Sequence, residues 1–231
     1  MLEIEWAGRM AYERAWKWQK ALVVERENDP SLDDKLLLVE HPPTYTMGRH
    51  GRPENLLLDQ RTLDEMGFAV HRVDRGGDIT YHGPGQLVGY PILNLKRIYG
   101  AGIGRIRKYV TDLEAVLMQL LKSYSISGQR FAGHRGVWVS TDLGMRKIAA
   151  IGIHVTAKGI SSHGFALNVN PNLEHFSGII PCGIQDYGVT SMTEILNVPL
   201  QVEEVYPRLI DTFTEIMSLE LNLKSIAYAN D

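Results

Sequence analysis

The sequence of 231 residues contains one cysteine and no long run of apolar residues. A single thiol cannot form an internal disulfide, so a disulfide-stapled secreted domain is excluded. No window approaches 18 consecutive apolar residues, and we therefore expect no transmembrane helix. The first residues, 1–6, also lack the basic and then apolar stretch of a signal peptide. Together these absences predict a cytoplasmic protein that does not associate with membranes.

The chain has little excess charge as well. Its formal net charge is −3 at pH 7, which gives no reason to expect a nucleic-acid partner. Internal repeats, low-complexity segments and long linkers are missing, so nothing in the sequence marks a domain boundary. We therefore expect residues 1–231 to form one large domain.

Apolar periodicity predicts both helices and strands. The strand-like segments come in groups between separated helices, and this grouping favours an α+β fold over a doubly wound sheet. Pro207 lies in the last expected helix and is tolerated only near a first turn. Ser191 and Glu194 have the spacing of a capping box, which predicts a short helix. The expected helices are 10–27, 105–122 and 202–219, and the expected strands are 36–40, 68–73, 136–140, 147–155 and 164–169.

Glycine is the abundant residue, with 22 copies, and five of them fall within residues 75–89. Such a cluster lets a backbone approach a ligand closely, although it also suits a plain turn between two strands. Its spacing matches neither a Walker A loop nor a dinucleotide fingerprint. His82 at its centre is either a base or donor to a carbonyl oxygen, or a structural histidine bonded to backbone.

The lone Cys182 lies between Pro181 and Gly183, where a turn can present a thiol to a ligand. It is either a small core residue or a nucleophile. Lys147 opens an apolar strand and is by default a surface residue with a buried stem. Beside a cysteine, however, its ammonium group would lower the pKa of the thiol.

Two further features have a functional and an ordinary interpretation. Backbone N–H groups beside Gly164 could bind an oxyanion, as acyl transfer requires. A basic cluster at the start of the long helix is either a solvated face or a docking site for an acidic carrier protein. This cluster consists of Lys96, Arg97, Arg105, Arg107 and Lys108.

In combination these segments resemble the lipoyl(octanoyl) transferase family, the octanoyltransferases of lipoate biosynthesis. The resemblance covers about residues 41–194 and depends on long, specific motifs in the family's order. These are HPPTYTMGR at 41–49, RGG at 75–77 with TYHGPGQ at 80–86, KIAAIG at 147–152, and HGFALNVN at 163–170 followed by IPCG at 180–183.

The resemblance implies a mixed sheet flanked by helices plus a small second sheet, similar to the catalytic domain of biotin and lipoate protein ligases. It also implies that Cys182 is the acyl-accepting nucleophile and that Lys147 lowers its pKa. No metal and no cofactor are implied. The implied substrate-binding residues are Arg75, Gly76, Gly77, Asp78, Ile79, Thr80, Tyr81, His82, Ala150, Ile151, Gly152, Gly164, Phe165 and Ala166.

The implied reaction moves an octanoyl or lipoyl group from acyl carrier protein, through a Cys182 thioester, to a lysine of a lipoyl domain. The implied acceptors are the E2 subunits of 2-oxoacid dehydrogenases and the glycine cleavage H protein. Three alternatives stay open: an ATP-dependent lipoate or biotin ligase, a cysteine hydrolase that pairs Cys182 with His82 or His163, and a non-enzymatic module that binds a lipoyl domain or a carrier protein. Chain-length preference, the preferred acceptor and the oligomeric state do not follow from the sequence.

Overall fold

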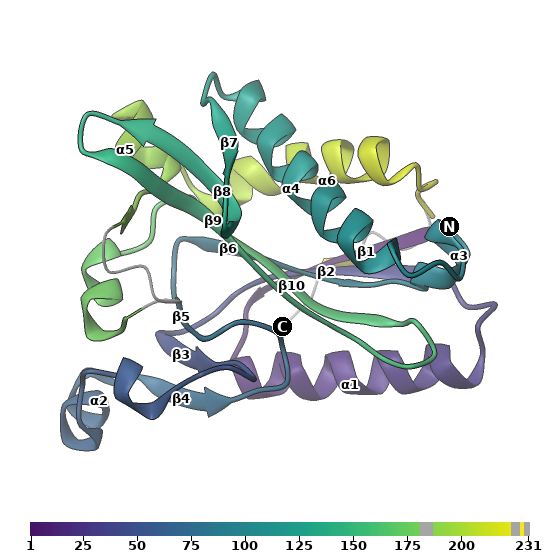
Figure 1. The fold of residues 1–231 in the computed structure, drawn as a ribbon, viewed down its shortest axis with the longest axis horizontal. Helices are drawn as coiled ribbons and strands as arrows, with labels where there is room; N and C mark the ends of the chain where they lie inside the picture. Colours follow the sequence, from purple (N-terminus) through teal and green to yellow (C-terminus); the bar gives the residue numbers. More distant parts are fainter. Residues whose placement is uncertain (181–186, 223–226, 229–231) are drawn as a thin grey trace.

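The computed structural model describes residues 1–180, 187–222 and 227–228. Cys182, the residue that the sequence suggests as nucleophile, lies outside these ranges. Within them, no helix is long and apolar enough to cross a membrane. The described chain forms two sheets and three layers around the larger of them (Figure 1).

The larger sheet is mixed, and its central strands pair antiparallel. In the described residues it has nine strands, with the order β12-β1-β2-β6-β10-β9-β8-β7 and a short β11 parallel to β9. Strands β1 and β2 are parallel, because α1 crosses over between them. The strands are β1 (Leu2–Arg9), β2 (Asp34–Glu40), β6 (Gln86–Ile92), β7 (Gly128–Phe131), β8 (His134–Thr141), β9 (Gly144–Val155), β10 (Ser161–Asn168), β11 (Gly188–Val189) and β12 (Ala227–Tyr228).

The smaller sheet contains three described strands in the order β4-β3-β5. They are β3 (Thr44–Met47), β4 (Ala69–Arg72) and β5 (Ile79–His82), with α2 (Gln60–Met66) before β4. Its apolar side chains form a core of their own, which includes Tyr45, Phe68 and Tyr81. A turn at 83–85 connects β5 directly to β6, so the chain passes from one sheet to the other within three residues.

Helices cover both faces of the larger sheet. Helix α1 (Tyr12–Asn28) packs on one face, whereas α4 (Arg105–Ser123) and α6 (Val202–Met217) cover the other (Figure 1). Six apolar side chains of α4 recur at helical spacing and are fully buried, so burial of this stripe stabilises the layer; they are Tyr109, Leu113, Val116, Leu117, Leu120 and Leu121. Two short helices, α3 (Leu95–Tyr99) and α5 (Met192–Leu196), complete the described helices besides two 3-10 turns, Pro53–Asn55 and Leu173–Gly178.

The expected α+β fold with a small second sheet is confirmed, as are the three long helices and the five strands. Ser191 caps α5 by accepting a hydrogen bond from the Glu194 backbone N–H. Pro207 lies inside α6, beyond the first turn where it was expected. Pro207 leaves the Glu203 carbonyl without its helix donor, and both residues are exposed to solvent.

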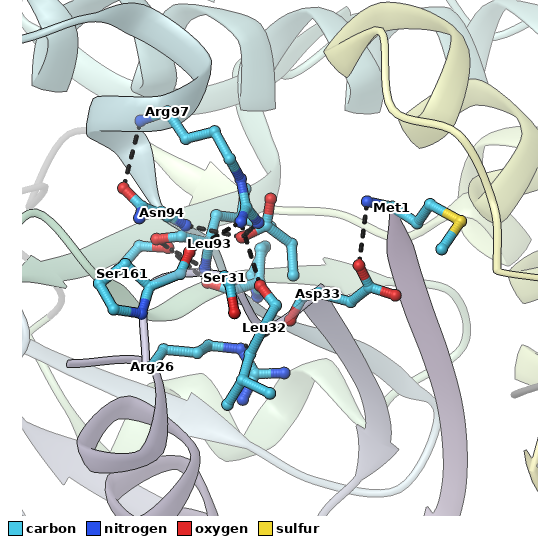
Figure 2. A network of polar contacts seen from close by, with 12 residues as sticks. Met1, Arg26, Ser31, Leu32, Asp33, Leu93, Asn94, Arg97 and Ser161 are labelled. Carbon is cyan, nitrogen blue, oxygen red and sulfur yellow. Dashed lines mark hydrogen bonds and ion pairs between the residues drawn. The ribbon is translucent and has the colours of Figure 1, made fainter. Parts of the chain in front are cut away.

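A polar network joins α1, the start of β2 and α3 at one end of the larger sheet (Figure 2). Asp34 is 1% exposed and accepts hydrogen bonds from the Asn94 backbone and from Arg97. Arg26 is buried and donates to the carbonyls of Leu22 and Asp33. These bonds satisfy charged groups in the interior and fix the end of the sheet opposite the site described below.

Candidate active site

A cavity of about 420 Å³ lies where the small sheet meets the end of β9. Strand β8 pairs with β9 only as far as Ala149, and β9 continues to Val155. The segment 75–77 covers this end, because the Gly76 N–H donates to the Ile153 carbonyl over 2.9 Å. A cavity of this size is typical of small-molecule sites.

The floor of the cavity is built from small residues on two paired strands. Ala150 lies opposite Ala166, and Gly152 lies opposite Gly164, so the four share one face of the sheet. Val88 of β6 also lines the cavity. The absence of bulk leaves a narrow apolar surface that suits an aliphatic chain.

Lys147 lines the cavity at the β8 side of this floor. Its Nζ atom lies 4.8 Å from the centre of the Trp138 ring, and Trp138 is the cross-strand partner of Lys147. The Tyr187 ring packs edge-on against Trp138, at 5.7 Å between centroids. An ammonium group over an indole is held in a defined position and is partly desolvated. This contact favours the charged form of Lys147 and keeps a cation at the cavity wall.

Arg75 is a buried cation at the opposite side of the cavity. Its guanidinium donates to the Thr46 carbonyl over 2.6 Å, to the Thr46 hydroxyl and to the Gly76 carbonyl. These bonds connect the small sheet to the segment 75–77 and hold that segment against β9. Arg75 therefore shapes the cavity wall.

His82 is held neutral at the cavity wall. Its Nδ1 atom lies 2.8 Å from Gln86 Oε1, and therefore carries the hydrogen. Burial is the main cause that lowers the pKa of His82 well below its usual value. Gln86 in turn donates to Asn168, which donates to the Thr190 carbonyl. The chain of bonds ends next to Lys147, whose carbonyl accepts from the Thr190 N–H.

A second neutral histidine, His41, lies behind His82. Its Nδ1 donates to the Met10 carbonyl and its Nε2 accepts from the Tyr90 hydroxyl, each over 2.7 Å. Burial lowers the pKa of His41 to about 4. Tyr12 stacks on His82, with 5.8 Å between centroids, and lines the cavity together with Tyr90. These rings close the inner end of the cavity.

Asp74 joins two further histidines beside the wall. It lies 2.8 Å from His163 Nε2 and 3.2 Å from His154 Nδ1. The hydrogen bond from His163 is the largest cause that lowers the pKa of Asp74. The pKa of His163 is lowered by burial, and Asp74 opposes that shift. The unusual positive φ of His163, 54°, places its ring in this contact.

The structure brings most of the sequence-predicted site residues together at one cavity. Asp78 and Tyr81 do not line it: Asp78 accepts hydrogen bonds from Arg52 and Asn55, and Tyr81 is buried in the core of the small sheet, where its hydroxyl meets His175. The sequence-predicted residues that line the cavity are Arg75, Gly76, Gly77, Ile79, Thr80, His82, Lys147, Ala150, Ile151, Gly152, Gly164, Phe165 and Ala166.

Cys182 and its separation from Lys147 lie outside the described residues. The described chain stops at Ile180, whose N–H donates to the Asn55 carbonyl, and starts again at Tyr187, which lines the cavity. Backbone N–H groups next to Gly164 belong to the sheet, because Phe165 pairs with Gly89 on one side and Ile151 on the other. We therefore do not expect these N–H groups to bind an oxyanion.

Sequence reasoning missed several residues of the wall. Tyr12 lies in the expected helix 10–27 and Tyr90 directly follows the glycine cluster at 75–89, and neither was expected in the site. Arg135 and Tyr187 stand in segments without a motif, so no local signal could identify them. Among the described residues, no group of three acidic, histidine or cysteine side chains could hold a metal ion.

Comparison with known sequences places the chain in a well-populated group. The family model described as the lipoyl protein ligase A/B catalytic domain matches residues 11–214. An octanoyltransferase of Chloroflexus aurantiacus is 43% identical over 226 residues, which is 98% of each chain. An octanoyltransferase of Alkaliphilus metalliredigens is 44% identical over 215 residues, covering 93% of this chain and 94% of its own.

Comparison with solved structures supports the same fold. The bipartite lipoate protein ligase of Thermoplasma acidophilum matches with a TM-score of 0.75 at 15% identity, over 100% of this chain and 88% of its own. A lipoate-protein ligase A bound with ATP matches equally well, over 100% and 90%. A biotin protein ligase of Aquifex aeolicus has a TM-score of 0.54 at 14% identity, over 94% and 70%. At these identities the likeness concerns the fold.

Proposed function

The chain belongs to the lipoyl protein ligase A/B catalytic-domain family, and on this basis we propose how it transfers an octanoyl group in protein lipoylation. It is an enzyme, a lipoyl(octanoyl) transferase. In the proposed route the donor is octanoyl-acyl carrier protein and the acceptor is a lysine of a lipoyl domain. An octanoyl thioester on Cys182 connects the two half-reactions, and residues 1–231 act as one catalytic domain.

In the first half-reaction, Lys147 takes the proton of the Cys182 thiol. The thiolate attacks the carbonyl carbon of the donor thioester, and a new carbon–sulfur bond forms. The bond to the pantetheine sulfur breaks, and that sulfur leaves with the proton from Lys147. The exchange of one thioester for another is nearly balanced in free energy, so no nucleotide is required.

In the second half-reaction, the neutral amine of the acceptor lysine attacks the octanoyl thioester on Cys182. An amide bond forms, the carbon–sulfur bond breaks, and the proton of the amine passes to Lys147 and then to the Cys182 sulfur. Conversion of a thioester to an amide is downhill. The octanoyl chain stays on the small-residue floor, where Ala150, Gly152, Gly164 and Ala166 exclude water from the intermediate.

One observation carries the proposal: Lys147 lines the same cavity as a floor of small residues that suits an aliphatic chain. The flanks of the Cys182 segment support it, because Tyr187 packs on Trp138 beside the Lys147 ammonium. We further propose that acceptors are the lipoyl domains of E2 subunits and the glycine cleavage H protein. The reaction takes place in the cytoplasm, where a single thiol stays reduced.

A mass measurement tests the route. Incubation with octanoyl-acyl carrier protein, without ATP, should add one octanoyl group to the protein in a form that hydroxylamine removes. The adduct should be lost in Cys182→Ala and discharged when a lipoyl domain is added. An adduct that persists in Cys182→Ala would overturn the assignment of the nucleophile. Transfer that requires ATP would instead assign the chain to the ligases.

A further inference from the structure

The small-residue floor of the cavity is called the acyl floor from here on. The cavity extends past this floor to the other face of β9. Ile151 and Ile153 alternate with Ala150 and Gly152, so their side chains lie on the face covered by α4. Both isoleucines line the cavity, as does Val110 of α4. This second arm, which we call the α4 groove, is apolar and lies beside the acyl floor.

The backbone of β9 is open along this groove. The pairing of β8 with β9 ends at Val137, which lies opposite Ala149. At Gly136, the residue before Val137, β8 turns away from β9. Gly136 has a φ of 105°, and its N–H points to Glu114 Oε1 at 3.4 Å. Ile153 directs its carbonyl outward to the Gly76 N–H, and Ile151, two residues earlier, directs its N–H and carbonyl to the same edge. The groove therefore offers one backbone donor and one acceptor to an amide-containing ligand.

Arg135 lies where β8 separates from β9 and lines the cavity. Its side chain is exposed, and within the described chain the structure gives it neither a hydrogen bond nor an ion pair. Arg135 precedes Trp138, the partner of Lys147, by three residues in β8. An exposed guanidinium at the cavity wall suits a phosphate, which it binds in a bidentate manner.

We propose that the α4 groove binds the phosphopantetheine arm of the thioester donor and that Arg135 binds the arm's phosphate. This inference rests on the proposed function. The arm combines the groups that the groove matches: a thioester at one end, two amides between apolar stretches, and a phosphate at the other end. The acceptor lysine carries no phosphate, so Arg135 distinguishes the donor from the acceptor.

Two donors that differ only in the phosphate test the inference: octanoyl-pantetheine and octanoyl-4′-phosphopantetheine, each with a lipoyl domain as acceptor. The ratio of their kcat/KM values isolates the phosphate. In the unaltered enzyme we expect the phosphate to raise kcat/KM by about tenfold or more, as is usual for a charged hydrogen bond. In Arg135→Gln the ratio should fall to about 1, and in Arg135→Lys it should recover in part.

Arg14→Gln is the matched control, because Arg14 is an exposed arginine on α1, on the opposite face of the sheet. It should keep the ratio of the unaltered enzyme. A ratio near 1 in the unaltered enzyme, or an unchanged ratio in Arg135→Gln, would overturn the phosphate site. Failure of both donors and of octanoyl-carrier protein to octanoylate the lipoyl domain would instead overturn the proposed function.

A further pair of donors tests whether the groove accepts the phosphopantetheine arm of a carrier protein, of coenzyme A, or of both. Octanoyl-carrier protein and octanoyl-coenzyme A both carry the phosphate at the same position, and Arg135→Gln should reduce kcat/KM for both. A donor whose kcat/KM does not depend on Arg135 does not place its phosphate in the groove. If kcat/KM does not depend on Arg135 for either donor, the inference is contradicted.

Discussion

At the scale of single residues, the position of Lys147 decides what the cavity can do. Its ammonium lies over Trp138 and is held there by an aromatic cluster that includes Tyr187. A long flexible side chain is thereby fixed at the cavity wall at little further entropic cost. The consequence is an ammonium group that is in place at the cavity wall before any substrate binds.

Replacing Lys147 by Met tests this role. The change keeps the apolar stem and removes the charge, so the pKa of the Cys182 thiol should rise toward its usual value. We expect alkylation of the thiol at pH 7 to slow by about tenfold, which corresponds to one pKa unit. The measurement is the rate of alkylation as a function of pH.

Lys122→Met is the control, because Lys122 is an exposed lysine near the far end of α4. It should leave the pH profile of alkylation unchanged. If the profile of Lys147→Met coincides with that of the unaltered protein, Lys147 is not the group that tunes the thiol.

The sequence predicted the composition of the site better than the direction of its side chains. The motif at 75–86 reads as one continuous loop, whereas the structure makes 79–82 a strand. In a strand, alternate side chains point to opposite faces. Thr80 and His82 therefore reach the cavity, and Tyr81 between them enters the core of the small sheet. The sequence motif alone does not show that side-chain direction alternates along this segment.

At the scale of elements, β9 and β10 together form the floor on which we propose that the acyl chain lies. Their small side chains are paired across the two strands, so the space above them is fixed by the register of the sheet. Tyr12 and Tyr90 close its inner end. The length of the pocket should therefore set the length of the acyl group that it accepts.

Ala150→Leu should shorten the accepted chain. Leucine adds three carbons over the floor, and each methylene that loses its burial costs about 0.8 kcal/mol. We expect the preference for octanoyl over butanoyl thioester, measured as a ratio of kcat/KM, to fall by about tenfold or more. Ala150→Ser, which hardly changes the volume, should preserve the ratio. An unchanged preference in Ala150→Leu would place the acyl chain elsewhere.

The long elements could be predicted because each has a periodic apolar stripe. Helix α4 and strand β9 were expected within three residues of their observed bounds. Strand β1 and the short strands β3, β5 and β7 were not expected, and each of the short ones has only four residues in which to show a periodic pattern. Strand β6 was also missed: it is buried on both faces and contains Gly89 and Pro91, which interrupt a strand pattern.

At the scale of the whole molecule, three buried histidines connect the two sheets. His41, His82 and His163 have pKa values lowered chiefly by burial, and the pKa of His41 falls to about 4, so the folded protein keeps His41 neutral near pH 6. The unfolded chain binds a proton at each of them near pH 6.5. Below that pH the unfolded state therefore holds more protons than the folded state, and stability falls as the pH falls.

We expect the free energy of unfolding to decrease between pH 7 and pH 5. His41 alone, whose pKa is about 4 in the folded protein, should account for about 2 kcal/mol of this decrease. The measurement is urea unfolding at both pH values. His41→Gln should weaken the pH dependence by that amount, whereas the control His50→Gln, at an exposed histidine, should not. Equal pH dependence in all three proteins would contradict this account.

The layers of the fold could be predicted, but the order of its strands could not. Alternation and helical spacing indicate which segments bury a face, and the family resemblance indicated a second sheet. The neighbours of β6 are β2 and β10, which lie far from it in the sequence. Pairing over such distances depends on tertiary packing, and no local pattern specifies it.

The same strand order has a consequence for the chain as it is synthesised. Half of the acyl floor belongs to β10, at residues 161–168, and β10 must insert between β6 and β9 before the floor exists. A nascent chain that ends before β10 leaves the edge of β6 unpaired and exposes its apolar residues. The protein therefore completes the floor of the cavity only after more than two thirds of it has left the ribosome, and until then we expect chaperones to bind at the unpaired edge of β6.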